Sequence, residues 1–212
     1  MLLLLLCPLW AQQNHVRDNQ DRLVGVQSFS VKTSTPGQEI RIWDTEERTP
    51  RCGFVVREGW VLTISTVPDP GTIRYRAFGK IAEVRAYSPE THLILLSAPG
   101  VGPGLTPIKV GVDMLEKGND ITVLTWSPGI PPVRTGKVVG TGPIFAEIQM
   151  QGAGGGAVGA IFSTLDSDLL LGLHVGGTTA AQKTGLVVSG QQIVNFLEKS
   201  APSLSILVVR KH

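Results

Sequence analysis

Residues 51–63 decide the fold, and they read Arg-Cys-Gly-Phe-Val-Val-Arg-Glu-Gly-Trp-Val-Leu-Thr. Two runs of β-branched and apolar residues flank a polar turn at Arg57-Glu58-Gly59, which predicts a β-hairpin. Short runs of the same kind recur at regular spacing and are separated by Gly, Pro and Asp. Because this punctuation is typical of antiparallel β proteins, we predict an all-β chain. Further expected strands cover residues 80–87, 91–96, 119–127, 134–139, 144–150, 169–177 and 185–188.

Three segments outside these strands complete the expected organisation. Residues 98–107 are rich in Pro and Gly and are the best connector between two halves of the chain. Residues 190–199 carry apolar side chains at helical spacing, which predicts a C-terminal helix. Residues 203–209 form an apolar segment ahead of two basic residues. This tail is either an extra strand or a partner-binding edge.

A second informative stretch is Gly152-Ala153-Gly154-Gly155-Gly156-Ala157, which lies between two strand-like runs. Glycines this dense mark a loop whose backbone adopts positive φ or approaches another group closely. By itself such a loop is more often a tight turn than a functional site. A phosphate-binding loop is not indicated, because the Lys-Ser/Thr pair and a following helix are missing.

The hairpin at residues 51–63 resembles the one that delivers the catalytic histidine in chymotrypsin-like serine proteases, which ends in Trp-Val-Leu-Thr-Ala-Ala-His-Cys. In that register Ile64 and Ser65 stand where the two alanines would be, and Thr66 stands where the histidine would be. Val67 replaces the cysteine that would pair with Cys52. The upstream residues Ile-Trp-Asp at 42–44 are similar to the granzyme and chymase branch of the family.

The glycine-rich loop resembles the nucleophile loop of the same family, Gly-Asp-Ser-Gly-Gly-Pro. Gly152, Ala153 and Gly154 then form an oxyanion-loop remnant, in which Ala153 replaces the aspartate and Gly154 the serine. Residues 91–96 resemble the strand that carries the triad aspartate, with His92 in its place. The resemblance therefore implies a degenerate triad at Thr66, His92 and Gly154. A lone histidine at a strand start is otherwise most often a hydrogen-bonded surface residue.

Residues 172–177 read Gly-Leu-His-Val-Gly-Gly and resemble the strand that borders the substrate pocket. The resemblance implies pocket-wall positions at Ile148, Val175, Gly176 and Gly177. The same six residues are also similar to picornaviral chymotrypsin-like cysteine proteases, which would need a cysteine in place of glycine in the loop at 152–157. We favour the animal branch, because the junction Arg22-Leu23 resembles an activation cleavage site of that branch.

The resemblance spans about residues 23–202 and implies two antiparallel β-barrels of the six-stranded type with a C-terminal helix. The first barrel is expected at about 23–97, the second at about 108–190 and the helix at about 190–199. Residues 203–212 would form the tail.

The N-terminus predicts secretion. Residues 1–11 are apolar up to Ala11 and are typical of a signal-peptide core without a basic n-region, and residues 12–22 would be a propeptide. A fragment boundary or a buried N-terminal strand is the alternative. The expected location is secreted, granular or extracellular, with no transmembrane segment. Cys7 would leave with the signal peptide, so Cys52 would be the one remaining thiol and is expected in the core.

Composition narrows the expected partners. The chain has 212 residues and a formal net charge of +2, with no run of five or more basic residues, which argues against nucleic acid. Four scattered histidines give no metal-ligand spacing, so we expect neither a metal nor another cofactor. The partner is expected to be a protein or peptide, while the oligomeric state stays open.

The sequence therefore predicts a serine-protease homologue that is not an enzyme, a pseudoprotease that acts by binding proteins or peptides. The alternative is a weak or repurposed endopeptidase, in which His92 with Ser65 or Thr66 forms a base and nucleophile pair. Such a pair would need a new oxyanion site, because the inherited backbone donors surround residue 154.

Overall fold

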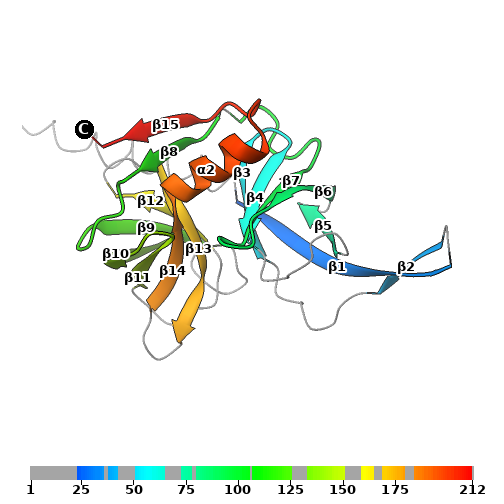
Figure 1. Cartoon of the computed structure of the whole chain (residues 1–212), viewed down its shortest axis with the longest axis horizontal. Coiled ribbons are helices and arrows are strands. Elements are labelled where there is room, and N and C mark those ends of the chain that lie inside the picture. Colours follow the sequence, from blue (N-terminus) through cyan, green and yellow to red (C-terminus); the bar gives the residue numbers. More distant parts are fainter. Residues whose placement is uncertain are drawn as a thin grey trace, which may run out of the picture.

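A computed structural model describes residues 23–35, 38–42, 51–64, 73–77, 80–105, 107–125, 133–150, 159–164, 169–179 and 184–211. Within these ranges the regular structure consists of β-strands and one helix (Figure 1). The strands form two curled sheets, and the helix lies between β14 and β15, the last two strands of the second sheet in chain order. The predicted all-β class with a C-terminal helix is confirmed.

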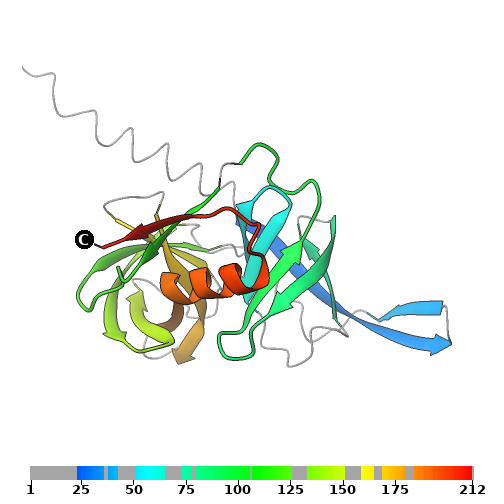
Figure 2. The ribbon, with the colours of Figure 1, turned by 45° about the horizontal axis from the view of Figure 1, so that its top comes forward.

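The first sheet closes into an antiparallel barrel. Its seven strands run in the order β2-β1-β3-β4-β7-β6-β5, and β5 pairs back to β1, so every strand except β2 belongs to a closed ring of six. The β2 strand pairs only with the outer part of β1, and the two extend beyond the barrel (Figures 1 and 2). The strands are β1 (Leu23–Thr35), β2 (Gln38–Ile42), β3 (Arg51–Arg57), β4 (Trp60–Ile64), β5 (Ile73–Ala77), β6 (Lys80–Tyr87) and β7 (Leu93–Ser97).

The second sheet repeats this closure. Its eight strands run in the order β12-β9-β10-β11-β14-β13-β8-β15, and β12 pairs back to β13, which closes another ring of six. The remaining strands β8 and β15 are added in parallel, β8 on β13 and β15 on β8. The strands are β8 (Lys109–Val112), β9 (Asp120–Thr125), β10 (Val133–Thr141), β11 (Phe145–Met150), β12 (Gly159–Ser163), β13 (Leu169–Thr179), β14 (Thr184–Ser189) and β15 (Leu207–Arg210).

Alternation along β3, β4 and β7 explains why these strands are nearly continuous apolar runs in the sequence. One set of side chains fills the interior of the first barrel, while the alternate set packs on the outside against the second barrel and the helix. Both faces are buried, so neither face carries the polar residues of a solvated sheet. The interior set includes Val55, Val61 and Ile94, and the outer set includes Phe54, Leu62 and Leu95.

The helix α2 (Gly190–Ser200) lies across the junction of the two barrels (Figure 2). It contacts β7 of the first barrel and β8, β13 and β14 of the second. Its apolar residues at helical spacing, Ile193, Val194 and Leu197, are buried in the shared cluster. Burying an aliphatic side chain of this size stabilises the fold by about 1.5–3 kcal/mol, so the helix fastens one barrel to the other.

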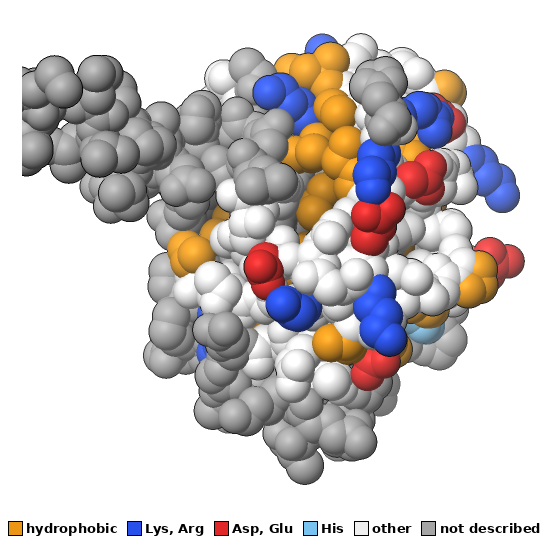
Figure 3. Space-filling model, turned by 90° about the vertical axis from the view of Figure 1, so that its left-hand side faces the viewer, with side chains coloured by type: hydrophobic (Ala, Val, Ile, Leu, Met, Phe, Trp, Pro, Cys, Tyr) orange, Lys and Arg blue, Asp and Glu red, His pale blue; other side chains and the backbone are white. Residues whose placement is uncertain are grey.

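The C-terminal tail forms β15, which is an extra strand, and its role as a partner-binding edge stays a prediction. Among the described residues its other edge pairs with no strand. The exposed fractions of Leu207, Val208 and Val209 are 53%, 37% and 36%. Figure 3 looks at the side of the molecule on which β15 ends, and it shows a band of apolar side chains in its upper part. Within the described ranges no helix is long and apolar enough to span a membrane.

Candidate functional site

The expected catalytic end of the first barrel lies where β4 ends and β7 begins. These antiparallel strands pair in register, with Ile64 at the end of β4 opposite Leu93 at the start of β7. His92 immediately precedes Leu93, so it lies at the end of the barrel from which the chain continues toward Thr66. Thr66 itself lies outside the described residues.

His92 has an unusual backbone conformation. Its φ of 59° is in the left-handed region, which non-glycine residues seldom adopt. The preceding turn fixes it, since the Ser88 N–H donates to the Leu93 carbonyl at 2.9 Å and the Leu93 N–H donates to Thr91 Oγ1 at 3.4 Å. The imidazole Nδ1 is buried and has no hydrogen-bond partner in the described part of the chain. The side chain is half-buried, and this differs from the hydrogen-bonded surface residue expected from the sequence.

Three other expected site features lie outside the described residues. They are the oxyanion-loop remnant Gly152, Ala153 and Gly154, which includes the nucleophile position Gly154, the alternative nucleophile Ser65, and Arg22 of the expected activation junction. The loop is bounded by described strands of the second barrel, since β11 ends at Met150 and β12 begins at Gly159. Its assigned roles stay predictions.

The strand β13, which carries the expected pocket-wall residues Val175, Gly176 and Gly177, has an edge beyond His174 that no other described strand pairs with. In its N-terminal part, β13 pairs with β12, from Leu170 opposite Phe162 to His174 opposite Gly159. Its C-terminal part pairs with β14 as far as Thr179. Among the described strands, Gly176, Gly177 and Thr179 therefore pair with β14 alone, and the register with β14 shifts at Val175 and at residue 178, which have no paired residue there. Gly176 and Gly177 lie in this half-paired segment, and Val175 is half-buried against the cluster shared by the two barrels.

The other expected pocket-wall residue lies inside the barrel. Ile148 in β11 has no exposed surface and belongs to the interior cluster of the second barrel, together with Val138 and Val187. The structure therefore gives Ile148 a packing role, because its side chain has no access to solvent.

His174 occupies a packed position beside a glycine. Its side chain is fully buried, and a Cβ on Gly185 would collide with its imidazole Nε2. Gly185 lies inside β14, where glycine otherwise weakens a strand. The glycine is required because the imidazole fills the space that a larger side chain would need. An isolated glycine within a strand is a signal of close approach, and it could have identified this contact from the sequence.

Leu23, the second residue of the activation junction, is already part of the first barrel. It pairs with Phe54 of β3. The same pairing continues along both strands until Val26 lies opposite Arg51. In the resembling enzymes the freed N-terminus moves into the second barrel. Here such a transfer would require residues 23–26 to leave their hydrogen-bonded ladder, because no unpaired residues separate the cleavage point from β1.

Among the described residues, the features available at this site are the imidazole of His92 and the edge of β13 beyond His174. Within the described ranges no group of three or more His, Cys, Asp or Glu side chains is placed to hold a metal ion. Sequence patterns could not have revealed the left-handed backbone of His92, because histidine carries no signal comparable to glycine.

No protein-family model matches the sequence, and a search of curated proteins gives no match. Solved structures do match. A crystal structure of Rv3671c from Mycobacterium tuberculosis H37Rv, a serine-to-alanine mutant in an inactive form, matches with a TM-score of 0.62 at 18% identity. The match covers 94% of this chain and 96% of that one. A second structure, the Rv3671c protease in an inactive form, matches with a TM-score of 0.61 at 18% identity and covers 92% and 96%. The fold is thus the chymotrypsin-like two-barrel fold.

Proposed function

We propose that the protein is a pseudoprotease, a chymotrypsin-fold protein that binds an extended peptide or protein segment without hydrolysing it. The observation that carries the proposal is the joint substitution at Thr66, His92 and Gly154 in a chain with this fold. Glycine has no side chain to attack a carbonyl, threonine supplies no base, and an imidazole supplies no fixed negative charge to orient one.

The open edge of β13 supports the binding half of the proposal. Backbone N–H and C=O groups at residues 175–179 have no partner strand on one side among the described strands. An extended peptide can add to such an edge through backbone hydrogen bonds, and this needs no nucleophile. Glycines at 176 and 177 leave the peptide side chains room to approach the strand.

The first test is an activity assay on the purified chain, before and after cleavage at Arg22. We expect no covalent labelling by a fluorophosphonate and no products from a peptide library. In triad enzymes the loss of any member leaves about 10³–10⁴-fold catalysis over water, which is far below a working protease. Labelling, or turnover that Ser65→Ala or His92→Ala abolishes, would contradict the proposal.

The binding test uses any library peptide that binds saturably, compared with the same peptide N-methylated at alternate backbone nitrogens. If the peptide adds to β13 as a strand, methylation at the hydrogen-bonded nitrogens abolishes binding, whereas methylation at the others leaves it unchanged. Equal binding of both methylated forms would contradict strand addition.

A repurposed hydrolase is the second candidate, and one observation favours it. The buried Nδ1 of His92 has no hydrogen-bond partner among the described residues, and strained, polar residues of this kind gather at functional sites. In this candidate His92 acts as the base for Ser65 or Thr66. The fluorophosphonate experiment separates the two candidates.

For branch and location we propose a granzyme-like or chymase-like relative that is secreted. The hairpin around Cys52 and the residues at 42–44 support the branch, and the apolar residues 1–11 support secretion. The paired position of Leu23 weighs against the activation mode of that branch. Detection of the full-length chain inside cells, with residues 1–11 retained, would contradict secretion.

A further inference from the structure

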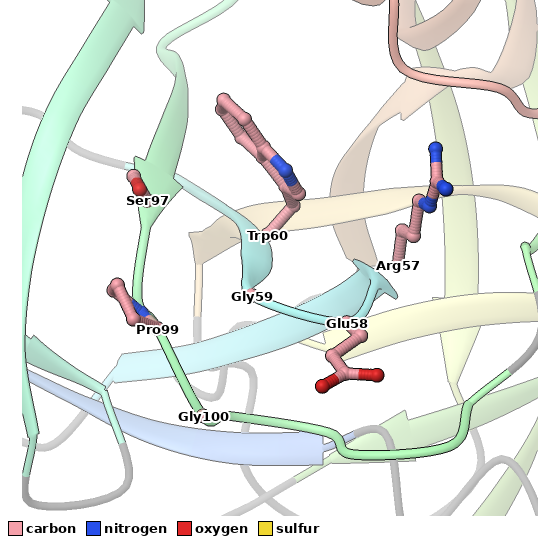
Figure 4. Close-up of a pocket in the computed structure, with 7 residues that line it drawn as sticks. All are labelled: Arg57, Glu58, Gly59, Trp60, Ser97, Pro99 and Gly100. Carbon is pink, nitrogen blue, oxygen red and sulfur yellow. The ribbon is translucent and has the colours of Figure 1, made fainter.

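A hollow lies at the opposite end of the first barrel from His92. It has a volume of about 490 Å³ and is open to solvent (Figure 4). We call it the Trp60 hollow. Measured along β7, the five residues from His92 to Ser97 correspond to about 16 Å, so the hollow is separate from the degenerate triad. Its lining residues are Arg57, Glu58, Gly59, Trp60, Ser97, Pro99 and Gly100.

Strand pairing places the side chains of Arg57, Trp60 and Ser97 in a row across three neighbouring strands of the first sheet. Arg57 on β3 pairs with Trp60 on β4, and Trp60 pairs with Ser97 on β7. Directly paired residues project on the same face of a sheet. Figure 4 shows the side chains of Arg57, Trp60 and Ser97 rising on one side, while the Glu58 carboxylate points the other way. An aromatic ring is thus flanked by a guanidinium and a hydroxyl group.

Hydrogen bonds hold the rim of the hollow in place. The Gly59 N–H donates to the Val101 carbonyl at 2.8 Å, and the Ala98 N–H donates to the Gly59 carbonyl at 2.8 Å. Gly59 has a φ of 75°, which suits glycine and few other residues. On the far side, Lys80 Nζ donates to the Gly100 carbonyl at 2.6 Å. A rim fixed before binding reduces the entropy that a ligand must overcome.

The free groups in the hollow are hydrogen-bond donors. In the described part of the chain, the side chains of Arg57, Trp60 and Ser97 have no hydrogen-bond or ion-pair partner. The Glu58 carboxylate accepts a hydrogen bond from the Gly104 N–H at 3.2 Å, so it is bonded on the side away from Arg57, Trp60 and Ser97 (Figure 4). Beyond Ser97, Glu83 pairs with Arg85 at 2.9 Å. Among the described residues, Arg57 is therefore the one lining side chain with both a charge and uncommitted donors, since the rim cation Lys80 donates to the Gly100 carbonyl.

These features select one kind of ligand group. A guanidinium binds a carboxylate or a phosphate through paired N–H donors. The residues that line the hollow include one cation, Arg57, and one carboxylate, Glu58, so a singly charged carboxylate fits better than a doubly charged phosphate. The backbone N–H groups of Gly59 and Gly104 are already bonded, so they cannot form the nest that phosphate sites use.

The exposed face of the Trp60 indole favours a ligand that carries an apolar side chain next to its carboxylate. The indole is half-buried, with one side packed against the cluster shared by the two barrels and the remainder in the hollow. Small-molecule sites usually enclose most of their ligand, whereas this hollow is open. We propose that the Trp60 hollow is a second peptide-binding site, which takes an Asp or Glu side chain next to an apolar side chain.

Nuclear magnetic resonance of ¹⁵N-labelled protein tests this proposal with the probe Ac-Ser-Asp-Phe-Ser-NH₂. The indole N–H signal of Trp60 is assigned with a Trp60→Phe variant. We expect saturable shifts of this signal and of the Gly59 and Gly100 amides. Replacing Asp in the probe by Asn should weaken binding at least about tenfold, because a charge-assisted pair is lost.

Variants of the protein provide the matched controls. Arg57→Gln should weaken binding of the Asp probe by at least about tenfold, while Arg210→Gln, at an exposed arginine on β15 of the second sheet, should leave it unchanged. The proposal is overturned if the Asn probe binds equally well, if Arg57→Gln has no effect, or if inorganic phosphate binds the hollow more tightly than the Asp probe. Shifts confined to β13 would also overturn it and would instead indicate the edge discussed above.

Discussion

At the scale of single residues, His92 is the most unusual position in the described chain. Left-handed backbone costs a non-glycine residue about 1–2 kcal/mol, because Cβ crowds the following carbonyl oxygen. Only His92 and Asp113 carry this conformation among the non-glycine residues described, with φ values of 59° and 60°. The hydrogen bonds of the surrounding turn impose the conformation, so the strain at His92 lowers the free energy of unfolding of the whole chain.

We predict that His92→Gly is more stable than His92→Ala by about 1 kcal/mol in free energy of unfolding. Both variants remove the imidazole, but only glycine accepts the left-handed backbone without strain. Urea denaturation of the two variants measures the difference.

The neighbouring residue Glu90 provides the control, because it is exposed in the same turn and lacks a positive φ. There Ala should be at least as stable as Gly, since glycine gains more conformational freedom in the unfolded chain. If Gly and Ala were equivalent at both positions, backbone strain at His92 would be ruled out.

At the scale of elements, the start of β1 determines what cleavage after Arg22 can do. Leu23 is already paired with Phe54, so a new amino group at Leu23 stays at the first barrel. Ala153 also removes the carboxylate that would receive it in the resembling enzymes. Burying one charge of such a pair without its partner costs about 3–5 kcal/mol, so a new amino group at Leu23 gains nothing by moving to a buried position that lacks a carboxylate.

We therefore predict that trimming the chain to Leu23 leaves the melting temperature nearly unchanged. The measurement compares full-length, trimmed and trimmed plus N-acetylated protein by calorimetry. A clear rise on trimming that disappears on acetylation would mean that the new terminus finds a buried partner, contrary to this prediction.

At the scale of the whole molecule, one apolar cluster joins the two barrels and the helix. It contains Leu95 of β7, Val188 of β14 and Ile193 of α2, all fully or nearly fully buried. The adjacent residue Ile94 points the other way and packs only inside the first barrel. Successive side chains of one strand therefore have different roles: Leu95 packs between the barrels, whereas Ile94 packs inside the first barrel.

We predict that Leu95→Ala and Ile94→Ala both lower the free energy of unfolding, each by about 2–5 kcal/mol. Their effects should spread differently. Leu95→Ala should accelerate amide hydrogen exchange in β14 and α2 as well as in the first barrel, whereas Ile94→Ala should accelerate it in the first barrel alone. Equal acceleration of β14 by both variants would show that the shared cluster is not the route of coupling.

Sequence patterns predicted a large part of the fold. Strand runs, turn residues and the helical spacing at 190–199 identified most of the strands and α2, because these signals are local. The site was predicted less completely. The position of His92 in the predicted site follows from the order of motifs along the chain, but its left-handed backbone was not predicted. The burial of Ile148 was not predicted either, because it depends on strands distant in sequence. The Trp60 hollow was missed because its row joins three strands through pairing.

The sequence alone determined the order of the elements, and the resemblance to serine proteases places Thr66, His92 and Gly154 at the predicted triad positions. Tertiary structure decided the closure of each barrel through β1–β5 and β12–β13, the parallel addition of β15 to β8, and the cluster between the barrels. These features need contacts between residues far apart in the chain. The junction between the barrels is stabilised by burying the outer faces of β3, β4 and β7 against the second barrel and the helix, which no single stretch of sequence specifies.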